Sequence, residues 1–377
     1  MINEEVNNPE ENENTDHSAY MPKNEETPSI SSEPTNNPVS EEAVSETVSE
    51  GIPNYGFERQ NNDLTWVTQK VNEVRGEIGK YVIGQHELVE LLLSGIFSNG
   101  HLLLEGAPGV AKTLSAKVLS KALAIDFSRI QFTPDMMPSD VLGTSIFNMK
   151  DAEFVFKKGP IFSNIVLIDE INRAPAKTQA ALFEVMEERQ ITYDGNQYPM
   201  EFPFLVIATQ NPIDQEGTYN LPEAQLDRFL YKIKVDYPEL EQEEEILRRY
   251  KNNIKSADLS AIKPIFSVAE IQKVQDIVEK IIIEDNLLKY IAAITNKTRN
   301  HGKIFLGGSP RASLSILKSS KAVAAIRGRD FVIPEDIQFI AKHVLNHRLI
   351  LTPEAEMEGI TPEEIVAEII ETLEVPR

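Results

Sequence analysis

Residues 106–113 read GAPGVAKT, and their glycines and Lys-Thr pair suit a phosphate-binding loop. In such a loop the backbone N–H groups surround the phosphates, the lysine reaches the outer phosphates, and the next hydroxyl is a ligand of Mg²⁺. A strand-like run, LLL, precedes the loop and a helix-like segment follows it, which is the order that the site requires. We therefore predict a nucleotide site made by Gly106, Ala107, Pro108, Gly109, Val110, Ala111, Lys112, Thr113 and Leu114.

One position in this loop departs from the usual pattern, because Ala111 stands where a second glycine is normal. Glycine lets the backbone approach the phosphates without a Cβ in the way, and alanine is the smallest alternative. A glycine-rich turn with a surface lysine is the competing interpretation of the loop. The polar residues farther along the chain decide between the two.

An Asp-Glu pair follows the next buried strand. Residues 165–168 read IVLI, a run of branched apolar residues typical of a parallel strand covered on both faces, and Asp169 and Glu170 come directly after it. Ligands of open α/β sheets bind at this carboxyl edge. We expect Asp169 to hold Mg²⁺ through water and Glu170 to polarise the attacking water as a general base. Two solvated acids would look the same in isolation, but the phosphate loop upstream favours the functional interpretation.

Three further polar side chains are candidates for the same chemistry. Asn211 follows the strand-like run FLVIA and could hydrogen-bond the water or the γ-phosphate, although an Asn before Pro also suits a turn. Arg228 either pairs with Asp227 or Glu223, or reaches a neighbouring subunit's nucleotide, where such an arginine is worth on the order of 10³-fold in rate. Arg311 lies near a helix N-terminus and is either an ordinary surface arginine or a cation facing the phosphates.

The net charge of the chain limits the classes of partner that it can bind. The chain has 377 residues, enough for two folded domains and a tail, and a net charge of −22. Residues 1–58 carry −13 of this charge, which leaves −9 for residues 59–377. This moderate acidity argues against a protein that tracks nucleic acid, because neutralising phosphates requires clustered Lys and Arg.

The patterns of cysteine, histidine and hydropathy exclude other classes of protein and of metal site. The chain has no cysteine, hence no disulfide framework and no thiolate zinc site. His343 and His347 are four residues apart but lack a third ligand, so we interpret them as polar helix residues and predict no metal other than Mg²⁺ carried by the nucleotide. No apolar run of 18 residues occurs and the N-terminus is acidic, so we expect a cytoplasmic protein without a transmembrane segment.

The elements that position these residues divide the chain into three parts. Residues 1–58 are rich in Glu, Asn, Ser and Pro and predict a disordered acidic tail. Residues 59–237 predict an α/β core. After residue 238 the strand patterns stop and helical periodicity dominates, which predicts an all-helical lid over residues 238–377. Thr361 and Glu364 form a capping-box pattern that starts its last helix.

Within the core, a helix is expected to begin at Asp63, whose side chain can cap its first turn. Residues 134–162 are long for a plain connection and contain a hairpin or short helix, which indicates a pore or partner loop. A second hairpin is predicted to turn at Asp194-Gly195. The apolar positions that predict the first helix are Leu64, Val67, Val71, Val74 and Ile78.

Together these motifs resemble the MoxR family of AAA+ ATPases. GAPGVAKT, IVLIDEINRAP, KTQAALFEVMEERQIT, ATQNP, LPEAQLDRF and GGSPRAS occur in the family's order, over about residues 63–376. The family's phosphate loops often read Ala-Lys-Thr, so Ala111 also fits. The resemblance implies an α/β fold: a P-loop domain with a central parallel five-stranded sheet and a smaller all-helical lid.

The resemblance also implies roles for single residues. Lys112 and Thr113 would be the phosphate-loop pair of the Walker A motif, with Asp169 and Glu170 as the Walker B acids. Asn211 would be the first sensor, Arg228 the finger inserted into the adjacent subunit's site, and Arg311 the second sensor. Val82, Ile83 and Gly84 resemble the stretch that packs on the adenine. Residues 136–162 resemble the helix-2 insertion and residues 188–203 the pre-sensor hairpin, which commonly face the ring pore.

The implied function is binding and hydrolysis of ATP with Mg²⁺ between the subunits of a homo-oligomeric ring, expected to be a hexamer. Such proteins resemble chaperones that remodel or mature client complexes together with von Willebrand factor A domain proteins. Three alternatives stay open: a magnesium chelatase-like motor subunit, a nucleic-acid motor, and a nucleotide-bound scaffold. The hairpin tip YDGN has no Lys or Arg to contact phosphate, which argues against the nucleic-acid motor, and intact Glu170 and Arg228 argue against the scaffold.

Overall fold

A parallel sheet of five strands forms the centre of the structure, a computed structural model that describes residues 57–211, 219, 221–251 and 258–376. All four strand pairings in this sheet are parallel. The predicted five-stranded parallel sheet is therefore confirmed. In spatial order its strands are β2 (Phe127–Gln131), β5 (Ile165–Asp169), β8 (Leu205–Gln210), β1 (His101–Glu105) and β9 (Phe229–Lys234).

Alternating apolar residues bury both faces of this sheet, because successive side chains of a strand point to opposite sides. Leu102 and Leu104 join one buried cluster, whereas Leu103 between them joins the other. The first cluster packs against α1 (Phe57–Ile78), α2 (His86–Phe97) and α3 (Lys112–Ala122). The second packs against α5 (Ala176–Glu188) and the short helix η1 (Ile171–Arg173).

Helix α1 begins earlier than predicted. It starts at Phe57, so Asp63 lies inside the helix and does not cap it. The Asp63 carboxylate instead pairs with Lys273 Nζ at 2.7 Å. The five apolar positions that predicted the helix are all buried. Periodicity thus located the buried stripe but not the helix start, because the polar turn before Asp63 has no apolar pattern of its own. Of the predicted tail, residues 57 and 58 belong to α1, and residues 1–56 lie outside the described residues.

The lid is helical, as predicted, but the expectation that strands end at residue 238 is wrong. Strands β10 (Ile304–Leu306) and β11 (Ile350–Leu351) pair as a small antiparallel sheet. They are too short to show a strand period in the sequence. The lid helices are α7 (Leu240–Tyr250), η2 (Leu259–Ala261), α8 (Val268–Lys280), α9 (Asp285–Arg299), α10 (Pro310–Ile326), α11 (Pro334–Leu345), α12 (Pro353–Met357) and α13 (Pro362–Thr372).

The capping box at the start of α13 is present, with Glu364 N donating to Thr361 Oγ1 at 3.3 Å and Thr361 N donating to Glu364 Oε2 at 2.8 Å. The first buried cluster continues from the sheet into α8, α9, α10, α11 and α13. The described residues accordingly form one compact unit. None of the described helices is both long and apolar enough to span a membrane.

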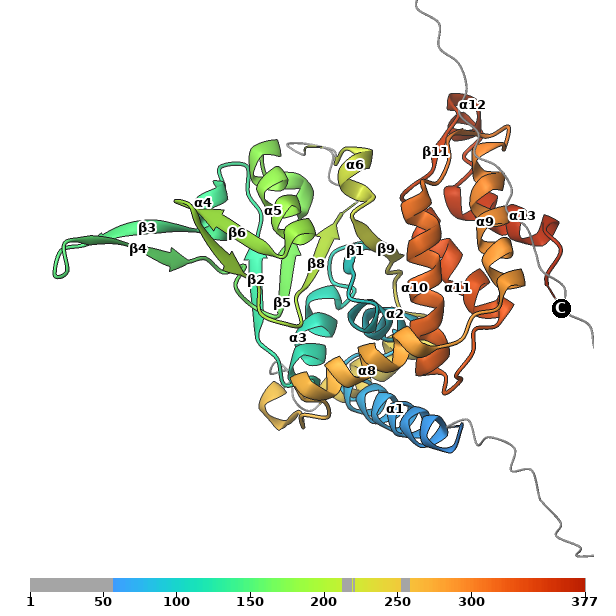
Figure 1. Ribbon diagram of the computed structural model, residues 1–377, viewed down its shortest axis with the longest axis horizontal. Helices are drawn as coiled ribbons and strands as arrows, with labels where there is room; N and C mark the ends of the chain where they lie inside the picture. The colour runs from blue at the N-terminus through green and yellow to red at the C-terminus, as the bar shows by residue number, and fades with distance from the viewer. Residues whose placement is uncertain (1–56, 212–218, 220, 252–257, 377) are drawn as a thin grey trace, which may run out of the picture. The chain divides into compact units, whose positions relative to one another are not determined.

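The insertion before β5 forms a short helix, α4 (Pro138–Leu142), and a hairpin of β3 (Gly143–Asn148) and β4 (Glu153–Lys158) that extends away from the sheet at the left of Figure 1. The second predicted hairpin is also present, with β6 (Gln190–Tyr193) and β7 (Asn196–Pro199) joined at Asp194-Gly195. The ring of Phe156 stacks on Tyr198 at 4.5 Å and lies 5.0 Å from Tyr193, between ring centroids. The two hairpins are therefore packed together.

Gly84, between α1 and α2, supports the position of α7. Its φ is +77°, and a Cβ there would overlap the side-chain amide of Gln242 in α7. The Gln242 Oε1 atom accepts a hydrogen bond from Glu239 N at 3.1 Å and so caps that helix. A side chain at position 84 would be strained and would also displace the cap.

We predict that Gly84→Ala lowers the free energy of unfolding by about 1–2 kcal/mol, since it adds left-handed strain and disturbs the cap. Gly76→Ala is the matched control, because a Cβ at this exposed position inside α1 meets nothing within 4 Å. Gly76→Ala should raise the free energy of unfolding by roughly 0.5–1 kcal/mol. Urea unfolding of the three proteins measures both changes, and equal effects of the two substitutions would contradict the role assigned to Gly84.

Candidate nucleotide-binding site

The predicted phosphate loop lies between β1 and α3, with α3 beginning at Lys112. Two of its residues adopt left-handed backbone conformations, Gly109 with φ +89° and Ala111 with φ +63°. Ala111 is therefore at a position where glycine would be free of strain, and its Cβ costs about 1 kcal/mol. The loop keeps this conformation because both ends are fixed, by β1 on one side and by the first turn of α3 on the other.

The Lys112 side chain folds back over the loop, and its Nζ donates to Gly106 O at 2.6 Å. Burial lowers the pKa of Lys112, and the charges of Asp169, Glu105 and Glu170 partly offset that effect. The ammonium group thus faces the acids at the end of β5 across the loop. An anionic group could therefore bind between the Lys112 ammonium and the N-terminus of α3.

Asp169 ends β5 and is only 7% exposed. Thr209 Oγ1 donates to Asp169 Oδ1 at 3.2 Å and accepts from Glu170 N at 3.1 Å, so one threonine of β8 orients both acids. The Arg129 guanidinium of β2 pairs with Asp169 Oδ2 at 2.5 Å. Neither Thr209 nor Arg129 was identified from the sequence. Thr209 directly precedes the Gln-Asn pair at its strand's end, and this position was the available signal.

Glu170 has a left-handed backbone, with φ 58° and ψ 54°, which turns the chain sharply away from β5. Gln131 Nε2, at the end of β2, donates to Glu170 Oε2 at 2.7 Å. Arg173 Nε lies 3.0 Å from the same oxygen. The carboxylate is thus held at the sheet edge by two donors that sequence reasoning missed.

These residues line two adjoining clefts that share Gly109, Ala111 and Leu114. A polar cleft of about 350 Å³ is lined by nine predicted site residues: Pro108, Gly109, Ala111, Lys112, Thr113, Leu114, Asp169, Glu170 and Asn211. The second cleft, of about 500 Å³, is lined by Val82, Ile83 and Val110 together with apolar residues of α7. Gly84 lies next to this cleft in the chain but is not among its lining residues.

The donor set of the polar cleft fits magnesium. Asp169 supplies carboxylate oxygens and Thr113 a hydroxyl. Mg²⁺ prefers such hard oxygen ligands, with few from the protein and the rest from phosphates and water.

The two histidines that are four residues apart do not form a metal site: His343 Nε2 lies 3.0 Å from Glu87 Oε1, and His347 Nε2 lies 3.1 Å from Phe229 O. Burial lowers the pKa of His347 well below its ordinary value, so it is neutral.

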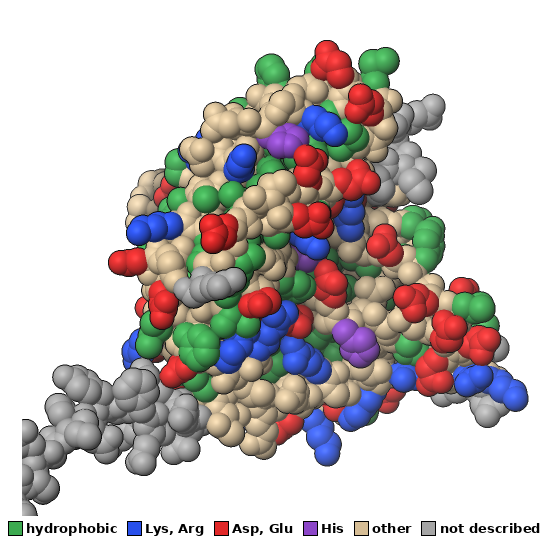
Figure 2. Space-filling view, turned by 90° about the vertical axis from the view of Figure 1, so that its right-hand side faces the viewer, with side chains coloured by type: hydrophobic (Ala, Val, Ile, Leu, Met, Phe, Trp, Pro, Cys, Tyr) green, Lys and Arg blue, Asp and Glu red, His purple; other side chains and the backbone are tan. Residues whose placement is uncertain are grey.

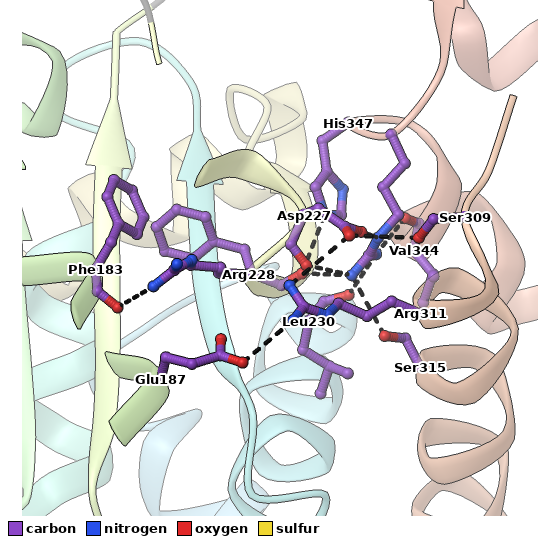
Figure 3. Close-up of polar contacts among 12 residues, drawn as sticks. Phe183, Glu187, Asp227, Arg228, Leu230, Ser309, Arg311, Ser315, Val344 and His347 are labelled. Carbon is purple, nitrogen blue, oxygen red and sulfur yellow. Dashed lines mark hydrogen bonds and ion pairs between the residues drawn. The ribbon is translucent and has the colours of Figure 1, made fainter. Parts of the chain in front are cut away.

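Four further predicted residues line neither cleft: Gly106 and Ala107 at the start of the loop, and Arg228 and Arg311. Arg228 Nη1 donates to Phe183 O in α5 at 2.6 Å, and Arg311 Nη2 lies 3.1 Å from Glu187 Oε1 on the same helix (Figure 3). The structure therefore separates the predicted residues into a cleft and an arginine pair that contacts α5. Asp227, which the sequence offered as a partner of Arg228, pairs with Arg348 at 2.6 Å.

Comparisons with known proteins agree with this geometry. Residues 101–231 match the ATPase family associated with various cellular activities (AAA), and residues 296–369 match the AAA lid domain. YeaC of Bacillus subtilis, an uncharacterised protein, is 45% identical over 299 residues, which are 79% of this chain and 92% of YeaC. Chaperone MoxR1 of Mycobacterium tuberculosis is 43% identical over 310 residues, 80% of this chain and 81% of MoxR1.

A solved structure from Cytophaga hutchinsonii, provisionally assigned as an ATPase, has a TM-score of 0.78 and 43% sequence identity and covers 85% of this chain and 99% of its own. The two family matches cover the sheet and much of the lid, and residues 101–231 include the loop and the acids that line the polar cleft. The chain therefore belongs to the MoxR family of AAA+ ATPases.

Proposed function

We propose that this ATPase binds ATP between the subunits of a homo-oligomeric ring, a hexamer, and uses hydrolysis to remodel or mature partner complexes. Von Willebrand factor A domain proteins and a client complex are the proposed partners. One observation carries the proposal: the chain places its phosphate loop and acids in one cleft but both candidate arginines outside it. The name of the relative MoxR1, a chaperone, supports the remodelling role.

In the proposed mechanism, Lys112 and the N–H groups of the phosphate loop, Pro108 excepted, bind the phosphates, and the base occupies the apolar cleft beside Val82 and Ile83. Thr113 and Asp169 would hold Mg²⁺, which supplies charge neutralisation at the phosphates when bound. Glu170 accepts a proton from the attacking water, and Asn211 orients that water. Gln131 and Arg173 limit the positions that the Glu170 carboxylate can take.

The arginines complete this site from a neighbouring subunit. Negative charge develops on the γ-phosphate oxygens during transfer, and a cation inserted there stabilises the transition state. Arg228 is half-buried. Its guanidinium donates to a backbone carbonyl of α5 and does not pair with the acids of the polar cleft in the same chain. Arg311 contacts the same helix. We therefore place both arginines opposite the nucleotide of the adjacent subunit, Arg228 as the finger and Arg311 as the second sensor.

The β3–β4 hairpin supports contact with a client. Its apolar side chains are unusually exposed, with Met149 90% and Phe154 72% accessible. The rings of Phe147 and Phe154 pack edge to face at 5.2 Å, which makes one apolar surface on the hairpin. Exposed apolar patches of this kind mark sites of protein interaction. The hairpin is therefore the proposed client-contacting element.

A nucleic-acid motor is less well supported. The tip of the β6–β7 hairpin, Tyr193 to Asn196, has no Lys or Arg. On the lid face shown in Figure 2, acidic side chains lie among the basic ones. A protein that tracks nucleic acid instead requires cations grouped along a path for the phosphates.

Substitutions of Lys112 and Glu170 should separate binding from turnover. Lys112→Ala is expected to abolish ATP binding because it removes the cation of the loop. Glu170→Gln is expected to keep binding and to lower kcat on the order of 10²–10⁴-fold, since it removes the general base. A fluorescent ATP analogue measures binding, and phosphate release measures turnover. Glu279→Gln, on an exposed part of α8, is the control, and wild-type turnover by Glu170→Gln would remove Glu170 from the mechanism.

Substitution of Arg228 tests the shared site. Arg228→Ala should lower kcat on the order of 10³-fold with little change in nucleotide affinity, because the arginine acts on the transition state of the neighbour. Steady-state ATPase is measured against protein concentration, with light scattering on the same samples, and wild-type activity should rise with assembly. Arg248→Ala, which removes an exposed arginine that pairs with Glu244, is the control. Concentration-independent activity that survives Arg228→Ala would mean that one chain holds a complete site.

A further inference from the structure

Arg348, just after α11, is a buried cation whose purpose the nucleotide site does not explain. It is 8% exposed, and its guanidinium makes six hydrogen bonds, two of which share one N–H of Nη2. Burial lowers its pKa, as does the charge of Arg311, and Asp227 counteracts both. Burying a charge is costly unless it is paired and fully hydrogen-bonded, so this site is specifically arranged to hold a guanidinium.

Four of the six bonds go to the short segment that carries Arg228. Arg348 contacts Asp227 Oδ1 at 2.6 Å and Asp227 O at 3.2 Å, on one side of Arg228. It contacts Phe229 O at 2.8 Å and Leu230 O at 3.3 Å, on the other side. The backbone from which Arg228 projects is thus held immediately before and immediately after that residue.

The other two bonds attach this segment to the lid. Arg348 donates to Val344 O in α11 at 2.6 Å and to Ser315 Oγ in α10 at 3.3 Å. Asp227 makes a second connection, because Ser309 Oγ donates to its Oδ2 at 3.3 Å and Arg311 Nη1 lies 3.8 Å from the same oxygen (Figure 3). The start of β9, helix α10 and the end of α11 therefore meet at one pair, Arg348 and Asp227.

Covering the outer edge of β9 is a simpler role for this region, but it does not require an arginine. Asn346 donates to Lys232 O at 3.0 Å, and His347 already contacts Phe229 O. These neutral side chains pair with β9 carbonyls without the cost of a buried charge. Arg348 adds bonds to Asp227 and Leu230 and a further bond to Phe229 O, so that it contacts the backbone on both sides of Arg228. A planar guanidinium with five N–H donors suits carbonyls on both sides of one residue.

We propose that Arg348 is a positioning residue for Arg228: it fixes the finger's backbone to the lid, so that the lid of one subunit sets the placement of the arginine that reaches the neighbour's nucleotide. This inference rests on the proposed function of Arg228. It assigns the lid a role at the site of the adjacent subunit in addition to its own.

The first test is the kinetics of Arg348→Met, which keeps an apolar side chain of similar length at the buried position. We expect kcat to fall on the order of 10- to 100-fold, because a misplacement of about 1 Å costs this much in rate. The KM for ATP should stay within about twofold, since residues 106–114 and the acids are untouched. Arg348→Lys should behave like Arg348→Met, because an ammonium cannot donate to carbonyls on both sides of Arg228.

Arg329→Met is the matched control. Arg329 also pairs with a buried lid aspartate, Asp336, at 2.6 Å, but it does not contact residues 227–230. The Arg329→Met variant should have a lower free energy of unfolding but an unchanged kcat. If Arg348→Met fails to fold, the double variant Arg348→Met/Asp227→Asn tests the same junction, because it removes both charges of the pair together, and the same pattern of lower kcat at constant KM is expected. Wild-type kcat in the folded single or double variant would overturn the proposal.

The ATP turnover of rings mixed from two variants separates positioning of Arg228 from a purely structural role of Arg348. Arg348→Met subunits retain Glu170 but hold the finger poorly, whereas Glu170→Gln subunits hold the finger correctly but lack the base. Mixing the two should raise turnover above the sum of the unmixed proteins, as an Arg228→Ala and Glu170→Gln mixture should. Rescue of Arg228→Ala without rescue of Arg348→Met would overturn the inference alone. Full activity of Arg228→Ala by itself would instead overturn the proposed function.

Discussion

Parallel pairing of the five strands fixes where the polar side chains of the cleft lie, because it brings the carboxyl ends of all strands to one edge. In the register of this sheet Gln131 is opposite Asp169, and Leu104, just before the phosphate loop, is opposite Thr209. Residues far apart in the chain are thereby placed within hydrogen-bond distance. The acids keep defined orientations because neighbouring strands, and not mobile loops, supply their partners.

The same sheet gives the chain two chemically different regions. One edge carries the loop, the acids and the amide that can bind and activate, while the start of the outer strand β9 carries Arg228 with Arg311 beside it. A single hydrophobic cluster runs from the sheet into the lid helices, so the lid cannot shift without straining its contact with β9. This construction supports the proposal that the site is shared between copies.

Much of this arrangement could be predicted from the sequence, because local patterns report local structure. The loop between β1 and α3, the acids after β5 and the turn at Asp194-Gly195 follow from short runs of residues. Three partners of the acids, Arg129, Gln131 and Thr209, could not be predicted, since their contacts depend on the register between strands about 40 residues apart. The pairing of Arg348 with Asp227 spans 121 residues and depends on how the lid packs. The pair β10–β11 was missed because two or three residues carry no period.

Helix α5 connects the arginines to the hairpins. Phe183 and Glu187, the contacts of Arg228 and Arg311, are four residues apart and lie on the same face of α5, and the chain passes from the end of this helix directly into β6. Stacking of Phe156 on Tyr198 extends the connection to the β3–β4 hairpin. A rotation of α5 about its axis would therefore change the contacts of both arginines and the position of the hairpins together.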